Sequence, residues 1–271
     1  MSDIDWKYAE LIGDCLSGEQ VTTRNSDCYR AVCLRTRFTD TPLVGVRKTA
    51  WKNALREWEW FMSGSNDIAT LDPRVHHWWK PWANADGRVR FNYSVQFRQA
   101  MGQRAEATDQ IARLVEGIRN HPYSRRHVIT TWNAADMLHP ECPITNCHNT
   151  VTQCFVDGTG ALNMKTYQRS ADMVCGLPAN WIQQWAFLMW LGRRAGRRVG
   201  WLEWEGGDCH VYAQHLSLAQ RIVREAFDGP AARSEAPQLV YNPTSDEFRA
   251  EDFTLSCEYT PLITEKAEMV V

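Results

Sequence analysis

The chain has 271 residues, 44% of them apolar and 23% charged, and its 30 basic against 32 acidic residues give a formal net charge of -2. This composition is typical of a soluble globular protein and excludes a protein that coats nucleic acid through a basic excess. The apolar run at residues 186–191 is too short to cross a bilayer, and the N-terminus lacks the basic and apolar regions of a signal peptide. We therefore expect a cytoplasmic protein with no direct nucleic-acid or membrane partner.

In chain order, hydrophobic periodicity predicts a helix at residues 5–18, a strand at 31–38 and a helix at 49–62. Residues 78–87 are rich in Trp and contain Pro81 and an Asp-Gly pair, which predicts a loop. A helix at 103–120 follows, then strands at 127–132, 151–156 and 161–166, the last two joined by a hairpin turn, and an apolar helix at 180–194. No repeat or linker separates these elements, so we expect one α/β (α+β) domain over residues 1–271.

Nine cysteines are spread along the chain without a C-x-x-C pair. Their odd number and spacing fit neither a disulfide framework nor a zinc site, so we expect no metal. Most of them are expected to be small buried hydrophobes. A reactive cysteine must then be distinguished by its neighbours, and Cys147 stands out because it precedes a predicted strand and is followed directly by His148.

The segment around Cys147 is one of five short motifs that are weak alone and informative together. They are residues 124–126 (SRR), 145–153 (TNCHNTVTQ), 167–172 (YQRSAD), 175–180 (CGLPAN) and 207–215 (GDCHVYAQH). Their order and approximate spacing resemble the thymidylate synthase family, whose members transfer a one-carbon unit from methylenetetrahydrofolate to C5 of a pyrimidine nucleotide. The resemblance runs from Arg24 to the C-terminus and implies a large mixed, mainly antiparallel sheet flanked by helices.

The chemistry of that reaction explains the residue types. C5 of a pyrimidine becomes nucleophilic after a thiolate adds to C6, and Cys147 is the expected nucleophile. A cation beside the thiol favours the thiolate, and the resemblance implies that Arg169 is this cation. The resemblance also implies a phosphate site made of Arg24, Arg125, Arg126, Arg169 and Ser170. In the family the Arg-Arg pair reaches across from a second subunit, so we expect a homodimer that shares Arg125 and Arg126 across its interface.

Asn180 is expected to read the base. Its carboxamide offers one donor and one acceptor, which match O4 and N3–H of uracil, whereas Asp at this position would suit cytosine. The expected substrate is therefore dUMP. The resemblance places His210 and Tyr212 at the ribose 3′-hydroxyl and Asp172 against the substrate.

One carboxylate must assist the proton movements. In the motif at residues 56–60 (REWEW), the register of the resemblance implies Glu57 rather than Glu59. The resemblance also makes Tyr93 a catalytic residue. It implies contacts with the folate co-substrate from Trp79, Trp82, Asp172, Gly176 and the terminal carboxylate of Val271.

The identity of the product depends on three further positions. Asn146, Ser94 and Ala179 stand where thymidylate synthases typically carry Pro, Gly and Phe, and the motifs Arg-Glu-x-Glu-Trp and Cys-x-Asn-Thr-Val resemble those of phage deoxycytidylate hydroxymethylases. We predict a phage-type enzyme that converts dUMP into 5-hydroxymethyl-dUMP, a precursor of modified DNA. The alternative is reductive methylation to dTMP, which Trp79 and the C-terminal tail favour because both help to exclude water.

Other functions remain open. The chain could be a dCMP hydroxymethylase or methylase, a nucleotide-binding homologue without catalysis, or a Cys-His hydrolase, although it carries no recognisable acyl-site motif. The interval from Cys147 to Gln153 is also one residue longer than in either branch of the family. We expect a β-bulge to absorb the extra residue.

Overall fold

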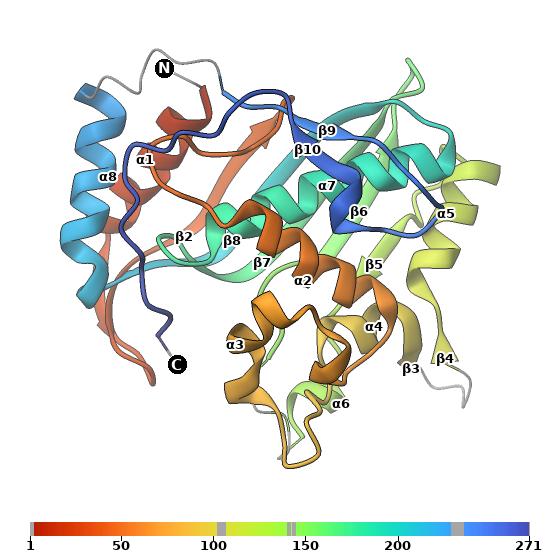
Figure 1. Cartoon of the computed structure of the whole chain (residues 1–271), viewed down its shortest axis with the longest axis horizontal. Helices are drawn as coiled ribbons and strands as arrows, with labels where there is room; N and C mark the ends of the chain where they lie inside the picture. The colour runs from red at the N-terminus through yellow and green to blue at the C-terminus, as the bar shows by residue number, and fades with distance from the viewer. Residues whose placement is uncertain (1–2, 102–106, 140–141, 143–144, 229–235, 271) are drawn as a thin grey trace.

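The structure, a computed structural model, describes residues 3–101, 107–139, 142, 145–228 and 236–270 (Figure 1). Its centre is a six-stranded sheet in the order β1-β2-β8-β7-β6-β5. The strands are β1 Glu19–Thr22, β2 Asp27–Phe38, β5 Val128–Thr130, β6 Val151–Val156, β7 Leu162–Asp172 and β8 Val199–Tyr212. β7 and β8 run parallel and the other neighbouring pairs run antiparallel. This confirms the predicted mixed, mainly antiparallel sheet.

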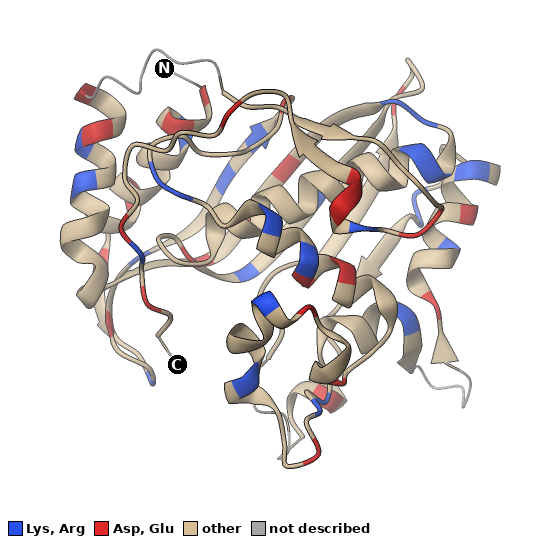
Figure 2. Ribbon diagram, viewed as in Figure 1, with Lys and Arg blue, Asp and Glu red and all other residues tan. Residues whose placement is uncertain are grey.

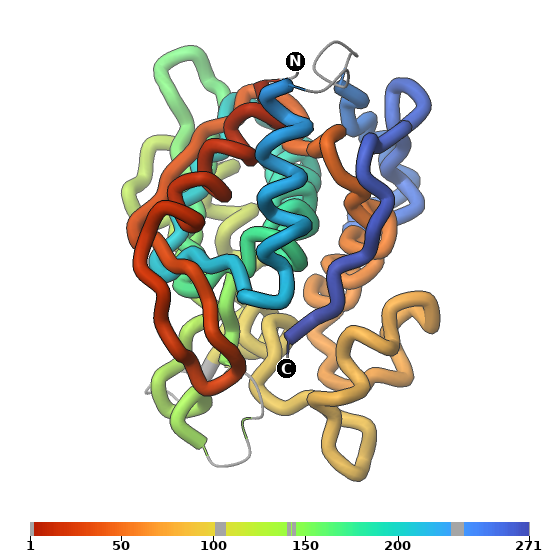
Figure 3. Tube along the Cα trace, turned by 90° about the vertical axis from the view of Figure 1, so that its left-hand side faces the viewer, coloured from red at the N-terminus to blue at the C-terminus, as the bar shows by residue number. Residues whose placement is uncertain are grey.

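Helices flank this sheet, some of them directly and others through a neighbouring helix. They are α1 Asp3–Leu16, α2 Trp51–Ser63, α3 His76–Trp79, α4 Tyr93–Gln99, α5 Gln110–Asn120, α6 Ala134–Met137, α7 Leu177–Ala195 and α8 Leu216–Asp228. α7 lies on β7 and β8, and α2 packs on α7 (Figure 1). α1 and α8 lie side by side next to β8 (Figure 3). No helix in the described part of the chain is long and apolar enough to span a membrane.

The core is one continuous cluster between the sheet and the helices. Its largest side chains are aromatic: Trp58, Trp181 and Trp204 are fully buried, and Trp181 makes edge-to-face contacts with Phe38 and Trp204. Four-residue spacing places Trp58 and Met62 on the buried side of α2, as a helical period requires. The tryptophans therefore serve mainly the core, and they hold α2 and α7 in fixed positions over the sheet.

Along the strands, the side chains that point away from the core are more exposed. In β6 the exposed residues Val151 and Phe155 alternate with the buried Thr152 and Cys154, as the two-residue period of a strand dictates. Basic and acidic residues are interspersed along the sheet (Figure 2), and Lys165 pairs with Glu205 at 2.6 Å. The exposed apolar residues Val32, Val128, Val151 and Phe155 belong to strands of the same sheet.

Most of the predicted elements are confirmed, with two corrections. The helix expected at residues 103–120 begins at Gln110, because Asp109 caps it by accepting a hydrogen bond from the Ala112 backbone N–H at 2.8 Å; residues 102–106 lie outside the described part. The stretch expected as a loop at 78–87 contains the end of α3 and a 3-10 turn, Lys80–Trp82, with Pro81 near its start.

Several elements were not predicted. β8 carries Glu203, Glu205 and a Gly-Gly pair, which do not resemble a buried strand. β1 and the helices α4 and α8 were also missed, together with the two short hairpin pairs β3 Ala100–Met101 with β4 Ala107–Thr108 and β9 Leu239–Tyr241 with β10 Phe253–Leu255.

The chain turns between Cys147 and the start of β6. Asn149 has a φ of 52°, in the left-handed region that Asn tolerates better than most residues. β6 then pairs with β7 in a continuous register from Val151 opposite Tyr167 to Val156 opposite Leu162. β6 itself has a continuous register, so no β-bulge lies within it, and how the chain absorbs the expected extra residue stays a prediction.

Candidate active site

The parallel strands β7 and β8 bring two of the sequence motifs together at their C-terminal ends. Ser170 lies opposite Asp208, and Asp172 lies opposite His210. The segment that contains Cys147 joins them, because the Arg169 backbone N–H donates to the Cys147 carbonyl at 3.0 Å. Carboxyl ends of parallel strands meet at one edge of a sheet, so residues far apart in the sequence share one site.

Cys147 and Arg169 form the centre of this site. Nη2 of Arg169 lies 3.3 Å from Sγ of Cys147, and Nε of the same guanidinium donates to the Asn146 carbonyl at 2.9 Å. Burial raises the pKa of the Cys147 thiol, and the charge of Arg169 opposes that rise. Arg169 also lies over the ring of Trp132, 5.4 Å from its centroid. The guanidinium is therefore held rigidly beside the sulfur.

Tyr93 and His148 form the wall behind Cys147. The buried Tyr93 hydroxyl accepts hydrogen bonds from the backbone N–H of Cys147 at 2.6 Å and of His148 at 3.3 Å. The His148 ring packs on Tyr93 with centroids 4.4 Å apart, and burial lowers the pKa of His148 to about 4. His148 is therefore a neutral imidazole at neutral pH and serves to hold the loop in place rather than to carry charge.

Glu57, on α2, accepts hydrogen bonds from two neutral donors. Nε1 of Trp79 lies 2.6 Å from Oε1, and Nε2 of Gln183 lies 2.7 Å from Oε2. Burial raises the pKa of Glu57 to about 7, and the two hydrogen bonds oppose the rise. A carboxyl group with this proton affinity can gain and lose a proton at neutral pH. By contrast, the Glu59 carboxylate accepts the Ala250 backbone N–H at 2.8 Å and serves the fold.

Asn180 lies in the first turn of α7. Its Oδ1 accepts from Nε2 of Gln168 at 3.1 Å, and its Nδ2 donates to Oε1 of Gln183 at 3.4 Å. Oε1 of Gln168 in turn accepts from Nε1 of Trp204 at 2.9 Å. The carboxamide is therefore held from both sides, and one donor and one acceptor position remain for a ligand.

The β7 and β8 residues have structural partners as well. Oδ1 of Asp172 accepts from the backbone N–H groups of Val174 and Cys175, both at 2.9 Å, which shapes the turn into α7. His210 lies 3.3 Å from Oδ1 of Asp208, and its ring contacts that of Tyr212 with centroids 4.8 Å apart. Gly176 precedes α7 directly. The roles of these residues in binding substrate and co-substrate stay predictions.

The phosphate-site arginines are not brought together by one chain. Arg24 lies in the turn between β1 and β2, while Arg125 and Arg126 precede β5, and all three are exposed. β1 and β5 are the two edge strands of the six-stranded sheet, so with the usual strand spacing they lie roughly 24 Å apart. Of the expected folate contacts, Trp79 is buried against Glu57 and Trp82 is half-buried. Val271 lies outside the described residues.

The three positions that bear on the product are placed as follows. Nδ2 of Asn146 donates to the Thr131 carbonyl at 2.9 Å, and Oγ of Ser94 donates to the Trp60 carbonyl at 3.0 Å. Both side chains are buried. Ala179 is half-buried at the start of α7 and packs against the core. The polar groups of Asn146 and Ser94 are thus engaged by the backbone.

Sequence reasoning missed four residues of this site. Thr145 accepts from Arg169, Trp132 lies under its guanidinium, and Gln168 and Gln183 hold Asn180 and Glu57. One signal was available, because Gln183 and Gln184 interrupt an otherwise apolar helix and are fully buried. In the described part of the chain there is no group of three or more His, Cys, Asp or Glu side chains that could hold a metal ion.

Comparison with known proteins gives the family. The model of the family described as Thymidylate synthase matches residues 7–271. The thymidylate synthase of Corynebacterium aurimucosum is 29% identical over 274 aligned positions, which cover 99% of this chain and 98% of that protein. The structure of the thermostable thymidylate synthase A from Bacillus subtilis superposes with a TM-score of 0.84 at 26% identity and covers 100% of this chain and 99% of that one. With a family match over almost its whole length, this protein belongs to the thymidylate synthase family.

Proposed function

We propose that the chain transfers a one-carbon group from methylenetetrahydrofolate to C5 of dUMP and releases dTMP, which is the reductive branch of the chemistry. The observation that carries the proposal is the contact of 3.3 Å between Sγ of Cys147 and the Arg169 guanidinium. The relatives named thymidylate synthase support methylation over the hydroxymethylation that the sequence favours. The backbone partners of Asn146 and Ser94 point the same way, because they occupy polar groups that a water would need.

Cys147 acts as the nucleophile in this proposal. Its thiolate forms a bond to C6 of uracil, which places electron density on C5, and the same bond breaks when the C5 proton has left and the product departs. Arg169 stabilises the thiolate before the addition and after the elimination. The Tyr93 hydroxyl fixes the backbone of the nucleophile through the Cys147 N–H. The folate supplies the one-carbon group and the hydride that reduces it.

Glu57 and Asn180 act on the base. Asn180 presents its remaining acceptor to N3–H and its remaining donor to O4. Glu57, whose pKa lies at about 7, exchanges protons with the base through water. His210, Tyr212, Ser170 and Asp172, at the ends of β7 and β8, are proposed to hold the sugar and phosphate.

The residues near α7 fit an anionic co-substrate. Arg47 is only 6% exposed, and its Nε and Nη1 have no hydrogen-bond partner among the described residues. Burial raises the pKa of Cys175 and the charge of Arg47 opposes the rise, so this guanidinium lies near the residue that precedes Gly176. Sγ of Cys175 contacts the Ala267 carbonyl of the C-terminal segment at 3.8 Å. A carboxylate of the folate would satisfy the buried guanidinium.

We propose further that the active form is a homodimer. Arg24 and the Arg125–Arg126 pair adjoin opposite edges of the sheet, so a single chain cannot close them around one phosphate. A second copy can supply the pair in trans. The exposed apolar residues of the sheet, Val32, Val128, Val151 and Phe155, suit such an interface.

Hydroxymethylation is the second candidate, and two features favour it. Nδ2 of Asn149 and Oε1 of Gln184 are buried without hydrogen-bond partners among the described residues. A water molecule would satisfy both groups close to Cys147. Ala179 also removes an aromatic side chain that thymidylate synthases place on the folate side. A water molecule that reached the transferred carbon before the hydride would give the hydroxymethyl product.

Product analysis tests the proposal. The chain is incubated with dUMP and methylenetetrahydrofolate, the product mass is measured, and dihydrofolate is followed by its absorbance. We expect a methyl product with one dihydrofolate formed per turnover, and Cys147→Ser should lower the rate on the order of 1,000-fold or more. A hydroxymethyl product without dihydrofolate would establish the second candidate. No C5 product and no tritium release from labelled C5 would contradict both.

Base preference provides a second test. Asn180→Asp replaces the donor toward O4 by an oxygen, so the ratio of kcat/KM for dUMP to that for dCMP should fall by at least about 100-fold. An unchanged ratio would refute the part assigned to Asn180.

A further inference from the structure

A continuous line of hydrogen bonds connects the base-reading residue to the carboxyl group. It runs from Trp204 on β8 through Gln168 on β7 to Asn180 on α7, and continues through Gln183 to Glu57 on α2. The donor–acceptor distances along the line are 2.9, 3.1, 3.4 and 2.7 Å. Gln183 is the one member that contacts both Asn180 and Glu57.

The orientation of each carboxamide in this line follows from the groups at its two ends. The indole N–H of Trp204 can only donate, so Oε1 of Gln168 accepts and its Nε2 faces Oδ1 of Asn180. At the other end the Ala54 carbonyl can only accept, so Nε2 of Gln183 donates to it at 2.9 Å. Oε1 of Gln183 therefore faces Nδ2 of Asn180. Rotating the Asn180 amide by 180° would break the bonds on both of its sides.

This arrangement has a consequence for base choice. Asn180, as it is held, keeps one lone pair of Oδ1 and one N–H of Nδ2 for a ligand, which suits uracil. Cytosine presents the opposite pattern, an acceptor at N3 and a donor at N4, and would require the rotated amide. Gln183 resists that rotation through Oε1.

The same residue acts on Glu57. Nε2 of Gln183 and Nε1 of Trp79 are the two donors to this carboxylate. A hydrogen bond to the ionised form lowers proton affinity, so each donor counteracts the rise in the pKa of Glu57 that burial causes. A purely structural glutamine would need only the bond to Ala54, which ties α7 to α2. Two of the three contacts of Gln183 are instead made to the residues that face the base.

We propose that Gln183 is a positioning residue with two tasks, holding the Glu57 carboxylate through Nε2 and fixing Asn180 in its uracil-reading orientation through Oε1. The inference rests on the proposed function, because it concerns the nucleotide that the site accepts. Gln183 does not itself need to touch the nucleotide.

Three variants of the full-length protein separate the two tasks. Gln183→Met keeps the length of the side chain and removes both polar groups, while Gln183→Glu keeps an acceptor for Asn180 and removes the donor to Glu57. Gln184→Met is the matched control, because Gln184 is the next residue of α7, is also fully buried, and also donates from a carboxamide, to Oδ1 of Asn149 at 2.9 Å. Urea unfolding of each variant establishes that it is folded before its activity is compared.

For Gln183→Met we expect the pH midpoint of kcat that is assigned to Glu57 to rise by about one unit. We also expect the ratio of kcat/KM for dUMP to that for dCMP to fall about tenfold. Each effect corresponds to the loss of one hydrogen bond. For Gln183→Glu we expect a larger upward shift of the midpoint with the base ratio largely kept, because two carboxyl groups would adjoin. Gln184→Met should leave the midpoint of the parent in place.

Two outcomes of the activity measurements would overturn the inference. One is a Gln183→Met protein that loses kcat while midpoint and base ratio stay unchanged, which would leave only a packing role. The other is a Gln184→Met protein that shifts the midpoint equally. If the parent makes no C5 product, the proposed function fails first. Equilibrium binding of dUMP and dCMP to parent and Gln183→Met then still decides whether Gln183 sets base preference, and an unchanged affinity ratio would overturn that part.

Discussion

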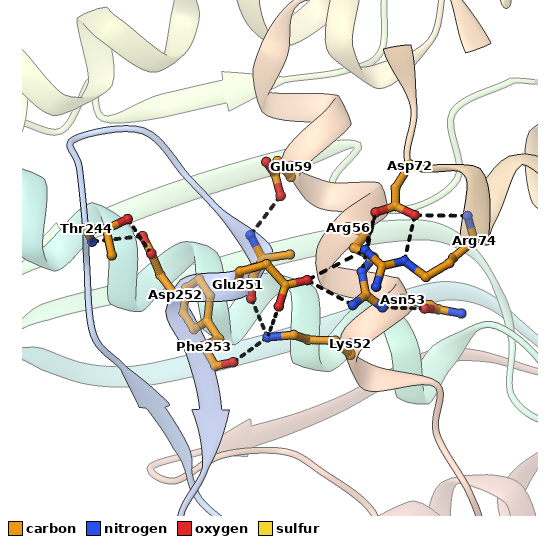
Figure 4. Close-up of polar contacts among 11 residues, drawn as sticks. Lys52, Asn53, Arg56, Glu59, Asp72, Arg74, Thr244, Glu251, Asp252 and Phe253 are labelled. Atoms are coloured by element: carbon orange, nitrogen blue, oxygen red, sulfur yellow. Dashed lines mark hydrogen bonds and ion pairs between the residues drawn. The ribbon is translucent and has the colours of Figure 1, made fainter. Parts of the chain in front are cut away.

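Two clusters of polar side chains adjoin successive residues of α2, and they contain different kinds of partner. In the first, Arg56 pairs with Glu251 at 2.9 Å and with Asp72 at 3.6 Å, and Lys52 lies 3.3 Å from Glu251 (Figure 4). In the second, Glu57 meets the neutral N–H groups of Trp79 and Gln183. Arg56 and Glu57 are adjacent in the sequence, yet the pKa values of the carboxyl groups in the two clusters are shifted in opposite directions from their ordinary values.

The difference shows how the partners of a carboxyl group decide whether it stays ionised at neutral pH or exchanges protons. Arg74, which donates to Asp72, holds the pKa of that carboxyl at about 2, and hydrogen bonding from Arg56 holds the pKa of Glu251 below its usual range. Such groups stay ionised at neutral pH and serve as fixed partners for the cations. Burial with neutral donors instead brings the pKa of Glu57 to about 7. Neutral partners therefore leave a carboxyl group able to exchange protons.

The largest expected effect comes from removing the proton-exchanging group. Glu57→Gln keeps the shape of the side chain and removes its ionisation, so kcat should fall by at least about 100-fold and the pH midpoint near neutrality should disappear. The rate of dUMP conversion measured from pH 5 to 9 checks this. Glu59→Gln is the matched control on the same helix and should retain most of the activity, because Glu59 bonds to the Ala250 backbone. Equal losses of activity in both variants would contradict the proton-exchanging role of Glu57.

Stability should depend on pH through Glu57 with a definite sign. Its pKa is raised on folding from 4.5 to about 7, so the folded state binds the proton more tightly than the unfolded chain. The stabilisation is full below pH 4.5 and is lost as the pH rises to about 7, and the loss amounts to about 3 kcal/mol. Glu57→Gln should remove this decline.

Urea unfolding from pH 4.5 to 8 measures the effect. The difference in unfolding free energy between Glu57→Gln and the parent should move in favour of the variant as the pH rises through that window. Parallel curves for the two proteins would mean that the carboxyl group does not carry its raised proton affinity in the folded state. Asp72 should contribute in the opposite direction, because its lowered pKa stabilises the fold above pH 4 and that contribution fades as the pH falls toward 2.

The sequence predicted the candidate reacting side chains better than the groups that hold them. Cys147, Arg169 and Asn180 lie in short motifs, and the structure brings them to the ends of neighbouring strands and the start of α7. Glu57 was chosen over Glu59 by its register in the family resemblance. These residues lie in motifs that are weak alone, so it was the order and spacing of the motifs along the chain, and the family resemblance they carry, that named them.

The supporting groups come from distant parts of the chain. Gln183 meets Glu57 across 126 positions, and Trp204 meets Gln168 across 36. A glutamine has no intrinsic preference for such a partner, so only the packing of α2 on α7 reveals the pair. The same limit explains β8: its Glu203 and Glu205 obscure the strand pattern, because their partners Arg37 and Lys165 lie on neighbouring strands. The kink at Asn149 was likewise invisible, since a left-handed residue leaves no mark in hydrophobic periodicity.

The smallest predicted effect concerns the ion-pair cluster itself. The Arg56 side chain is 11% exposed, whereas that of Arg74 is 59% exposed, so Arg56→Met should lower the free energy of unfolding by about 1–2 kcal/mol and Arg74→Met by a smaller amount. Urea titrations in low and high salt measure both losses. The pH midpoint of activity should stay where the parent has it, because the cations of this cluster bond to Asp72 and Glu251 rather than to Glu57. If Arg56→Met moved the pH midpoint, the charge of Arg56 would influence the pKa of Glu57. The two clusters would then be electrostatically coupled.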